Sequence, residues 1–199
     1  MALIVDAGIR EMLVEQQDVF YYVTLMNETY AQPTIPAEVH GDVVSGCYRF
    51  AHYPASSNSS KNVTLLGSGA ILNEVVKAAQ QLAAEGIGVD VFSVTSWSEL
   101  ARDGQASEVT ALEGREGRGS GAPFVAQQLA RSAGPIVAAT DYVRAVPESI
   151  RAFIPQGRRY VTIGTDGFGR SDTRAALRDF FGVDGESIAR AARLALADE

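Results

Sequence analysis

The feature of this sequence that most restricts its fold is a regular alternation of short apolar runs with helical patterns after residue 60. Four of the runs have the length and β-branched content of buried strands: Val63–Gly67, Val89–Thr95, Ile136–Thr140 and Tyr160–Thr165. Helical spacing is found in Ile71–Glu85, Ala122–Arg131, Tyr142–Phe153 and Thr173–Phe181. Strands joined through helices need crossover connections, which produce a mostly parallel sheet covered on both faces. The predicted fold class is therefore α/β, with three α/β/α layers.

The stretch before residue 61 follows a different pattern. Residues 1–26 combine a predicted helix, Ile4–Gln16, with a predicted strand, Val19–Leu25. Residues 27–60 contain Pro33 and Pro36 and are expected to form a linker followed by one extra strand, Val43–Tyr53. Residues 61–199 then form the main domain, in which a last helix, Glu186–Ala197, is expected to pack on the outside. The sheet should have about five strands, of which one can run antiparallel.

Composition excludes several classes of function. The formal net charge is −7 and the basic residues are scattered, so we expect no nucleic-acid partner. The single cysteine, Cys47, cannot form an internal disulfide and is expected to be buried and reduced. No apolar run approaches membrane-spanning length, and Met1–Ile9 lacks the order of a secretory signal. We therefore expect no membrane partner and a cytoplasmic location.

The first candidate site is the turn Gly67-Ser68-Gly69, where a strand ends and a helix begins. Such a turn points backbone N–H groups and the positive end of a helix at a bound anion, so a phosphate or carboxylate is one occupant to consider. The third glycine of the dinucleotide fingerprint is missing, however, which favours a tight turn without a ligand. A serine hydrolase is disfavoured as well, because Leu66 occupies the glycine position before Ser68.

The second candidate site is the loop Gly164–Asp172, which has the densest motif of the chain. Asp166 and Arg170 offer a catalytic acid and an anion clamp, but opposite charges in one loop more often hold the loop itself. Ser171 suits the N-cap of the next helix. Asp141, at the equivalent turn of the preceding unit, is interpreted as a helix cap and secondarily as a ligand, since open sheets bind ligands at this end of their strands.

Several of these segments resemble the homodimeric bacterial pyruvate dehydrogenases that use thiamine diphosphate. The resemblance covers nearly the whole chain, and the fold it implies is that of the transketolase C-terminal domain. It is carried by Phe20–Tyr30 with Pro33 and Pro36, Gly46-Cys47-Tyr48, Leu65–Leu72, Val91–Gly104, Ala139–Tyr142 and Gly164–Asp172. The stretch Thr95–Gly104 and the loop Thr165–Asp172 are more similar to this branch than to the transketolases.

The resemblance implies decarboxylation of a 2-oxo acid on thiamine diphosphate and acyl transfer to a lipoyl group. It identifies residues 1–26 as a remnant of the preceding pyrimidine-binding domain and residues 61–199 as a transketolase C-terminal-like domain. The family's Gly-Asp-Gly and asparagine motif for magnesium and diphosphate is absent from this sequence. We therefore expect the chain alone to bind no cofactor and to be inactive, because the reaction needs cofactor, metal and acid–base groups in one site. Thiamine diphosphate and magnesium belong to the complete enzyme.

The resemblance implies three partners: the cofactor-binding domains or chains of the same enzyme, a homodimer mate and the lipoyl acyltransferase. The chain would then be an assembly and dimer-interface domain. Two alternatives stay open, namely a stand-alone subunit of a split enzyme and a regulatory domain that binds an anion. The sequence departs from the family over Ala106–Gly121, and Glu113–Gly121, rich in glycine and charge, is expected to be a mobile surface loop.

Overall fold

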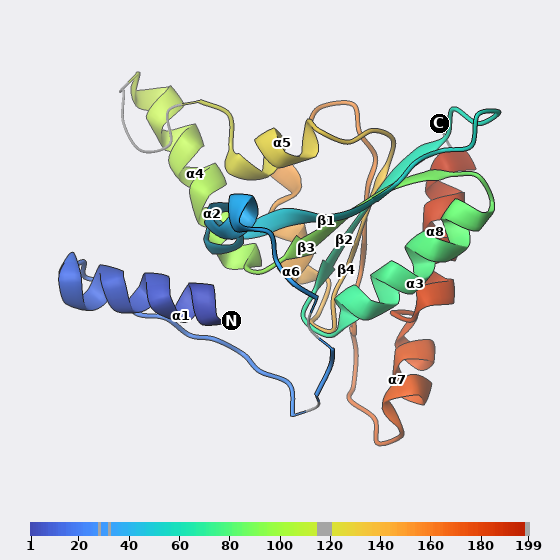
Figure 1. The fold of residues 1–199 in the computed structure, drawn as a ribbon, viewed down its shortest axis with the longest axis horizontal. Coiled ribbons are helices and arrows are strands. Elements are labelled where there is room, and N and C mark those ends of the chain that lie inside the picture. The colour runs from blue at the N-terminus through green and yellow to red at the C-terminus, as the bar shows by residue number, and fades with distance from the viewer. Residues whose placement is uncertain (28, 32, 115–120, 198–199) are drawn as a thin grey trace.

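The computed structural model describes residues 1–27, 29–31, 33–114 and 121–197. Five strands form one sheet in the order β1-β3-β2-β4-β5 (Figure 1). Their bounds are β1 Cys47–Tyr53, β2 Asn62–Ser68, β3 Gly88–Val94, β4 Ile136–Ala139 and β5 Tyr160–Ile163. Strands β2 to β5 are parallel, and only β1 runs antiparallel, beside β3. The predicted α/β class, with a mostly parallel sheet of about five strands, is confirmed.

One face of the sheet is covered by α3 (Ile71–Ala84) and α8 (Gly185–Ala197). Val63 and Leu65 on the central strand pack with Ile188 of α8 in a continuous apolar cluster. Ile188, Ala189 and Ala192 are fully buried. The expectation that the last helix packs on the outside is therefore wrong, because its apolar side completes the core next to α3.

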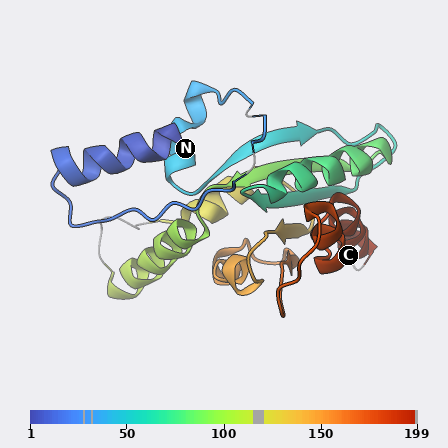
Figure 2. The same ribbon diagram turned by 90° about the horizontal axis from the view of Figure 1, so that it is seen from below.

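The other face is covered by α4 (Trp97–Glu113) and α5 (Phe124–Leu129). A short helix, α6 (Ala145–Glu148), and a 3₁₀ turn, Arg151–Phe153, replace the single helix predicted over 142–153. Figure 2 shows this layer and the α3/α8 layer on opposite sides of the sheet. The sequence interpretation missed α4. Its signal was a capping box, in which Ser96 Oγ accepts a hydrogen bond from the Glu99 backbone N–H at 3.1 Å.

The first 46 residues differ most from expectation. Helix α1 (Ala2–Ile9) continues as a π-helix, Arg10–Val14, and ends near the predicted position. The predicted strand Val19–Leu25 is wrong, since this run pairs with no strand among the described residues. The predicted strand Val43–Tyr53 starts too early, because α2 (His40–Val44) comes first and Gly46, with φ of +111°, turns the chain before β1.

Two further expectations concern exposed segments. Of the predicted loop Glu113–Gly121, residues 115–120 lie outside the described residues, while Glu113 ends α4 and Gly114 has φ of +62°. In the part of the chain that the structure describes, every helix is too short or too polar to serve as a membrane-spanning segment.

The C-terminal helices α7 (Arg174–Phe181) and α8 are joined to α3 by one buried carboxylate, Glu74 of α3. It accepts hydrogen bonds from Arg178 Nη1 at 3.0 Å and from Lys77 Nζ at 2.9 Å. Its second oxygen accepts the backbone N–H of Gly185 at 3.2 Å, at the start of α8. Arg178 lies on α7, so this carboxylate connects three helices. A buried charge with this many donors stabilises an arrangement that its loss would leave uncompensated.

We predict that Glu74→Ala lowers the free energy of unfolding by about 3 kcal/mol, because it removes the buried carboxylate that accepts the Gly185 N–H and the Nη1 of Arg178. Urea denaturation of purified protein measures the change. Glu85→Ala is the matched control, since Glu85 also pairs with an arginine, Arg193 at 2.7 Å, but at the surface. It should cost less than about 1 kcal/mol. Equal losses for the two variants would contradict the role given to Glu74.

Candidate functional site

The residues singled out in the sequence gather along one edge of the sheet. Gly67 on β2 pairs with Ala139 on β4, which pairs with Ile163 on β5. The three parallel strands therefore end side by side, and the candidate residues lie at the end of β2 and in the loops that follow the three strands. In Figure 1 this is the lower edge of the sheet, where α3 begins and below which α7 lies. We call it the carboxyl edge.

At the Gly67-Ser68-Gly69 turn, the space around the backbone is filled by side chains and backbone of the same chain. A Cβ atom at Gly67 would lie 2.8 Å from Val75 Cγ2 and 3.0 Å from Leu72 Cα, so α3 approaches the strand too closely for any side chain here. Ser68 is 7% exposed, and its hydroxyl donates to Thr140 Oγ1 at 2.9 Å. Gly69, with φ of +53°, turns the chain into α3. Close helix packing is the reason for the glycine at 67.

Asp141 does not have the role that the sequence suggested, and Asp166 makes the contact expected of Asp141. No hydrogen bond to the Asp141 carboxylate is found among the described residues, and α6 starts only at Ala145. The prediction that Asp141 caps a helix is therefore wrong. The carboxylate of Asp166, from the next loop, accepts from the Arg144 backbone N–H at 3.3 Å and from Arg144 Nε at 3.0 Å. A side chain that is distant in the sequence thus supplies the contact at the start of α6.

Arg170 and Ser171 also differ from expectation. Arg170 lies over the ring of Phe180, 4.2 Å from its centroid, and the predicted pairing of Asp166 with Arg170 is replaced by the Asp166–Arg144 pair. Ser171 is not the N-cap of α7. That position belongs to Thr173, whose hydroxyl accepts the Ala176 N–H at 3.3 Å. Arg170, Ser171 and residues of α7 line an open hollow of about 320 Å³.

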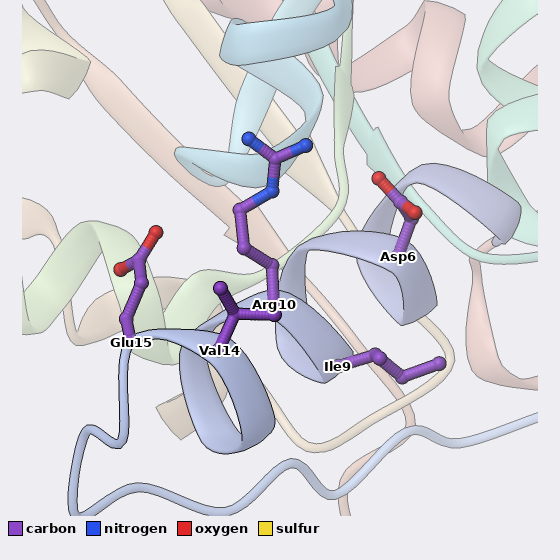
Figure 3. Close-up of a pocket in the computed structure, with 5 residues that line it drawn as sticks. All are labelled: Asp6, Ile9, Arg10, Val14 and Glu15. Atoms are coloured by element: carbon purple, nitrogen blue, oxygen red, sulfur yellow. The ribbon is translucent and has the colours of Figure 1, made fainter.

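A second hollow, of about 460 Å³, lies on the N-terminal helix (Figure 3). Asp6, Ile9, Arg10, Val14 and Glu15 line it, all from α1 and its π-helical continuation. In Figure 3 the side chains of Asp6, Arg10 and Glu15 point to one side of the helix, and Ile9 points elsewhere. Because its walls come from one helix, this hollow is an uncovered helix face and not an enclosed site.

Some polar groups with specific partners lie away from the carboxyl edge, and the sequence interpretation missed them. Asp90, buried in β3, pairs with two residues of β1: its carboxylate binds Arg49 and accepts a hydrogen bond from His52 Nδ1 at 2.9 Å. An aspartate inside an apolar run was the available signal. Hydrogen bonds from Arg151 hold the pKa of Glu148 at about 2, against an opposing effect of burial. Both clusters join neighbouring elements.

The described residues offer few groups that could act as a nucleophile or bind a metal. Burial raises the pKa of the Cys47 thiol to about 12, and the nearby charge of Asp42 acts in the same direction. The thiol is therefore buried and protonated at neutral pH, as the sequence suggested. Within the described residues, no three His, Cys, Asp or Glu side chains are grouped so that they could hold a metal ion. At the carboxyl edge, Asp166 is paired with Arg144, and Asp172 accepts the Thr173 backbone N–H.

The fold defines the class of protein. The structure is similar to transketolase from Leishmania mexicana, with a TM-score of 0.51 and 19% identity over 80% of this chain and 19% of that one. Transketolase from Campylobacter jejuni gives a TM-score of 0.50, with 17% identity over 77% of this chain and 19% of that chain. At these identities the similarity shows the fold alone. The fold is that of an α/β domain of transketolase-like enzymes.

Sequence comparison identifies the family more closely. Residues 46–184 match the family described as the Transketolase-like TK C-terminal domain, and the chain belongs to this family. It is 47% identical to a pyruvate dehydrogenase E1 component from Cupriavidus necator, over 100% of this chain and 22% of that protein. The corresponding protein of Escherichia coli K12 is 40% identical, over 96% of this chain and 21% of its own length. The chain thus spans about a fifth of these relatives and is homologous to their C-terminal part.

We predict that Asp166→Ala lowers the free energy of unfolding by about 1 kcal/mol, because it removes the acceptor for two Arg144 donors. Asp141→Ala is the matched control and should change stability by less than about 0.5 kcal/mol. Urea denaturation of both variants tests the roles of the two aspartates. A larger loss for Asp141→Ala would reverse the assignment made from the structure.

Proposed function

We propose that this chain is the C-terminal domain of a pyruvate dehydrogenase E1 component, and that it serves assembly and carries no catalytic group. In this proposal the complete enzyme decarboxylates a 2-oxo acid on thiamine diphosphate and transfers the acyl group to a lipoyl group of the acyltransferase. The observation that carries the proposal is the 40–47% identity to proteins named pyruvate dehydrogenase E1 component, which extends over nearly the whole chain. The transketolases share only its fold.

The division of the chain into parts supports the assembly role. Figures 1 and 2 show α1 and the segment after it lying apart from the sheet. Most of the exposed large apolar side chains of the described residues belong to this segment: Met1, Val5, Ile9, Met12, Leu13, Val14, Val19, Phe20, Tyr21, Tyr22, Val23, Leu25 and Met26. An apolar surface of this extent is typical of a protein interface. We assign residues 1–26 to the preceding pyrimidine-binding domain, residues 27–60 to a linker and extra strand, and residues 61–199 to the C-terminal domain.

The same assignment accounts for the run Val19–Leu25. Its β-branched and aromatic residues are those of a strand, but a strand is stable only when its backbone groups are paired. Tyr22 is 87% exposed and Phe20 88% exposed. The run also pairs with no strand in the part of the chain that the structure describes. In the proposed enzyme this run joins the sheet of the preceding domain.

The cofactor belongs elsewhere in the proposed enzyme. Thiamine diphosphate supplies the electron sink for decarboxylation, and magnesium binds its diphosphate. The contribution of this chain is to position the domains that hold both, together with a second protomer and the lipoyl acyltransferase as further partners. When an active site is built between domains, a shift of those domains by about 1 Å can lower the reaction rate substantially.

We predict that the purified chain shows no pyruvate decarboxylation when it is supplied with thiamine diphosphate and magnesium, because it lacks the groups that bind and activate the cofactor. The assay follows release of carbon dioxide from carboxyl-labelled pyruvate. The complete enzyme that contains this segment is the positive control and should be active. Activity of the chain alone would refute a purely structural role, and an inactive complete enzyme would refute the assignment to pyruvate dehydrogenase.

We predict that the chain self-associates through residues 1–26. The triple variant Phe20→Ser, Tyr22→Ser, Leu25→Ser should sediment as a smaller species than the unaltered chain at the same concentration, because it removes exposed apolar surface from the segment. Analytical ultracentrifugation over a range of concentrations provides the measurement. Leu112→Ser is the control, since Leu112 is also 88% exposed but lies on α4. An unaltered chain that is strictly monomeric contradicts the prediction.

A further inference from the structure

One side chain at the carboxyl edge is exposed to an unusual degree. Phe168 is 95% exposed, although its loop is held in place on both sides. Before it, Asp166 is paired with Arg144, and after it, Arg170 is stacked on Phe180. Gly167, with φ of +97°, and Gly169, with open space at its Cβ position, flank the ring. The loop therefore presents an aromatic ring on an anchored turn with small neighbours.

Other exposed apolar side chains belong to the same edge. Tyr142 and Val143, in the loop after β4, are 43% and 46% exposed. The two loops are in direct contact, because the Thr165 backbone N–H donates to the Tyr142 carbonyl at 2.9 Å. Phe180, on α7, is 55% exposed and borders the hollow next to Arg170. We call Tyr142, Val143, Phe168 and Phe180 the edge patch. Aromatic residues grouped in this way on a surface mark a contact with another protein.

The chain itself indicates what lies against this edge. The chain after residue 23 crosses the carboxyl edge (Figure 1). Three hydrogen bonds hold it there. Tyr142 donates to Thr24 Oγ1 at 2.6 Å, and Arg174 donates to Asn27 Oδ1 at 2.6 Å. Arg178 Nη2 donates to the hydroxyl of Tyr30 at 3.0 Å. The edge patch is thus continuous with the attachment of the linker.

We propose that, in the complete enzyme, the edge patch docks on the part of the preceding domain that lies before residue 1, with Phe168 inserted into an apolar pocket there. This inference rests on the proposed function, which supplies the preceding domain. The length of the relatives supports it, because the chain covers only 22% of the Cupriavidus necator protein and leaves several domains to be accommodated. A linker that is already bound to this edge keeps that domain within reach of the patch.

The charge beside the patch restricts the pocket further. Among the described residues, no carboxylate pairs with Arg170, whose guanidinium is held over Phe180. The carboxylate of Asp172, which lines the same hollow, accepts the Thr173 backbone N–H at 2.7 Å. A guanidinium fixed on an aromatic ring is ready to bind a carboxylate of a partner. The proposed pocket therefore has an acidic group at its rim.

Photo-crosslinking in the complete enzyme tests the docking. Phe168 is replaced by p-benzoylphenylalanine, the enzyme is illuminated, and the joined peptides are identified by mass spectrometry. We expect crosslinks to peptides of the same enzyme that lie outside residues 1–199. Leu112 carries the same benzophenone side chain in the control and should give no such crosslink, because it is equally exposed on α4. Crosslinks from position 168 only to the acyltransferase, only to residues 1–199, or to nothing would overturn the proposal.

A second measurement covers the energetics of docking. In the complete enzyme, Phe168→Ser should accelerate amide hydrogen exchange about tenfold in the preceding-domain peptides that the crosslinks identify, whereas Leu112→Ser should leave it unchanged. Unchanged exchange in Phe168→Ser would count against the patch even if crosslinks form. Pyruvate-dependent acetyl transfer is assayed in parallel. An enzyme that forms the crosslinks but lacks this activity would refute the proposed function and leave the docking intact, so the two failures are distinguishable.

Discussion

The structure after residue 61 depends on the position of β2 in the middle of the sheet. This strand pairs in parallel with β3 on one side and with β4 on the other, and it is buried on both faces. Val63 and Leu65 face α3 and α8, while Leu66 faces α4 and α5, so a single strand joins the two apolar clusters of the domain. Both clusters lose a wall if β2 shifts, because the side chains of a strand alternate between the two faces. The close approach of α3 at Gly67 fixes where the strand ends.

The sequence was sufficient for the elements whose own residues carry a clear apolar pattern. Strands β2 to β5 and helices α3, α7 and α8 lie within a few residues of their predicted bounds, because each buries an apolar pattern that the sequence displays directly. Helix α4 was missed because its exposed face and small residues gave a weak apolar pattern. The middle of α4 needs a glycine at position 104, because a Cβ there would lie only 2.3 Å from Cδ2 of the Phe153 ring. No sequence pattern shows that contact.

The errors in the candidate site have a common physical origin. Asp141 and Ser171 were predicted as caps because they precede helices in the sequence, and capping was treated as local. In the structure α6 has no side-chain cap, Asp166 from an adjacent loop accepts the Arg144 N–H just before it, and Thr173, two residues later than predicted, caps α7. The run Val19–Leu25 failed in the same way, since strand formation depends on a partner that the local sequence does not contain. Position along the sheet edge was predictable, but the choice among nearby polar groups was not.

In open α/β sheets the carboxyl edge is where ligands usually bind, because helix N-termini and loop side chains converge there. In this domain the converging groups are directed at one another and at the linker. Ser68 is bound to Thr140, Asp166 to Arg144, and the arginines of α7 to Glu74, Asn27 and Tyr30. Three aromatic side chains, Tyr142, Phe168 and Phe180, remain exposed at that edge beside polar ones such as Asp166 and Arg170. Aromatic surface is suited to burial against protein more than to phosphate binding. Nucleotide-binding sheets of this class hold their ligand at this edge, whereas in this chain we propose that the edge holds domains together.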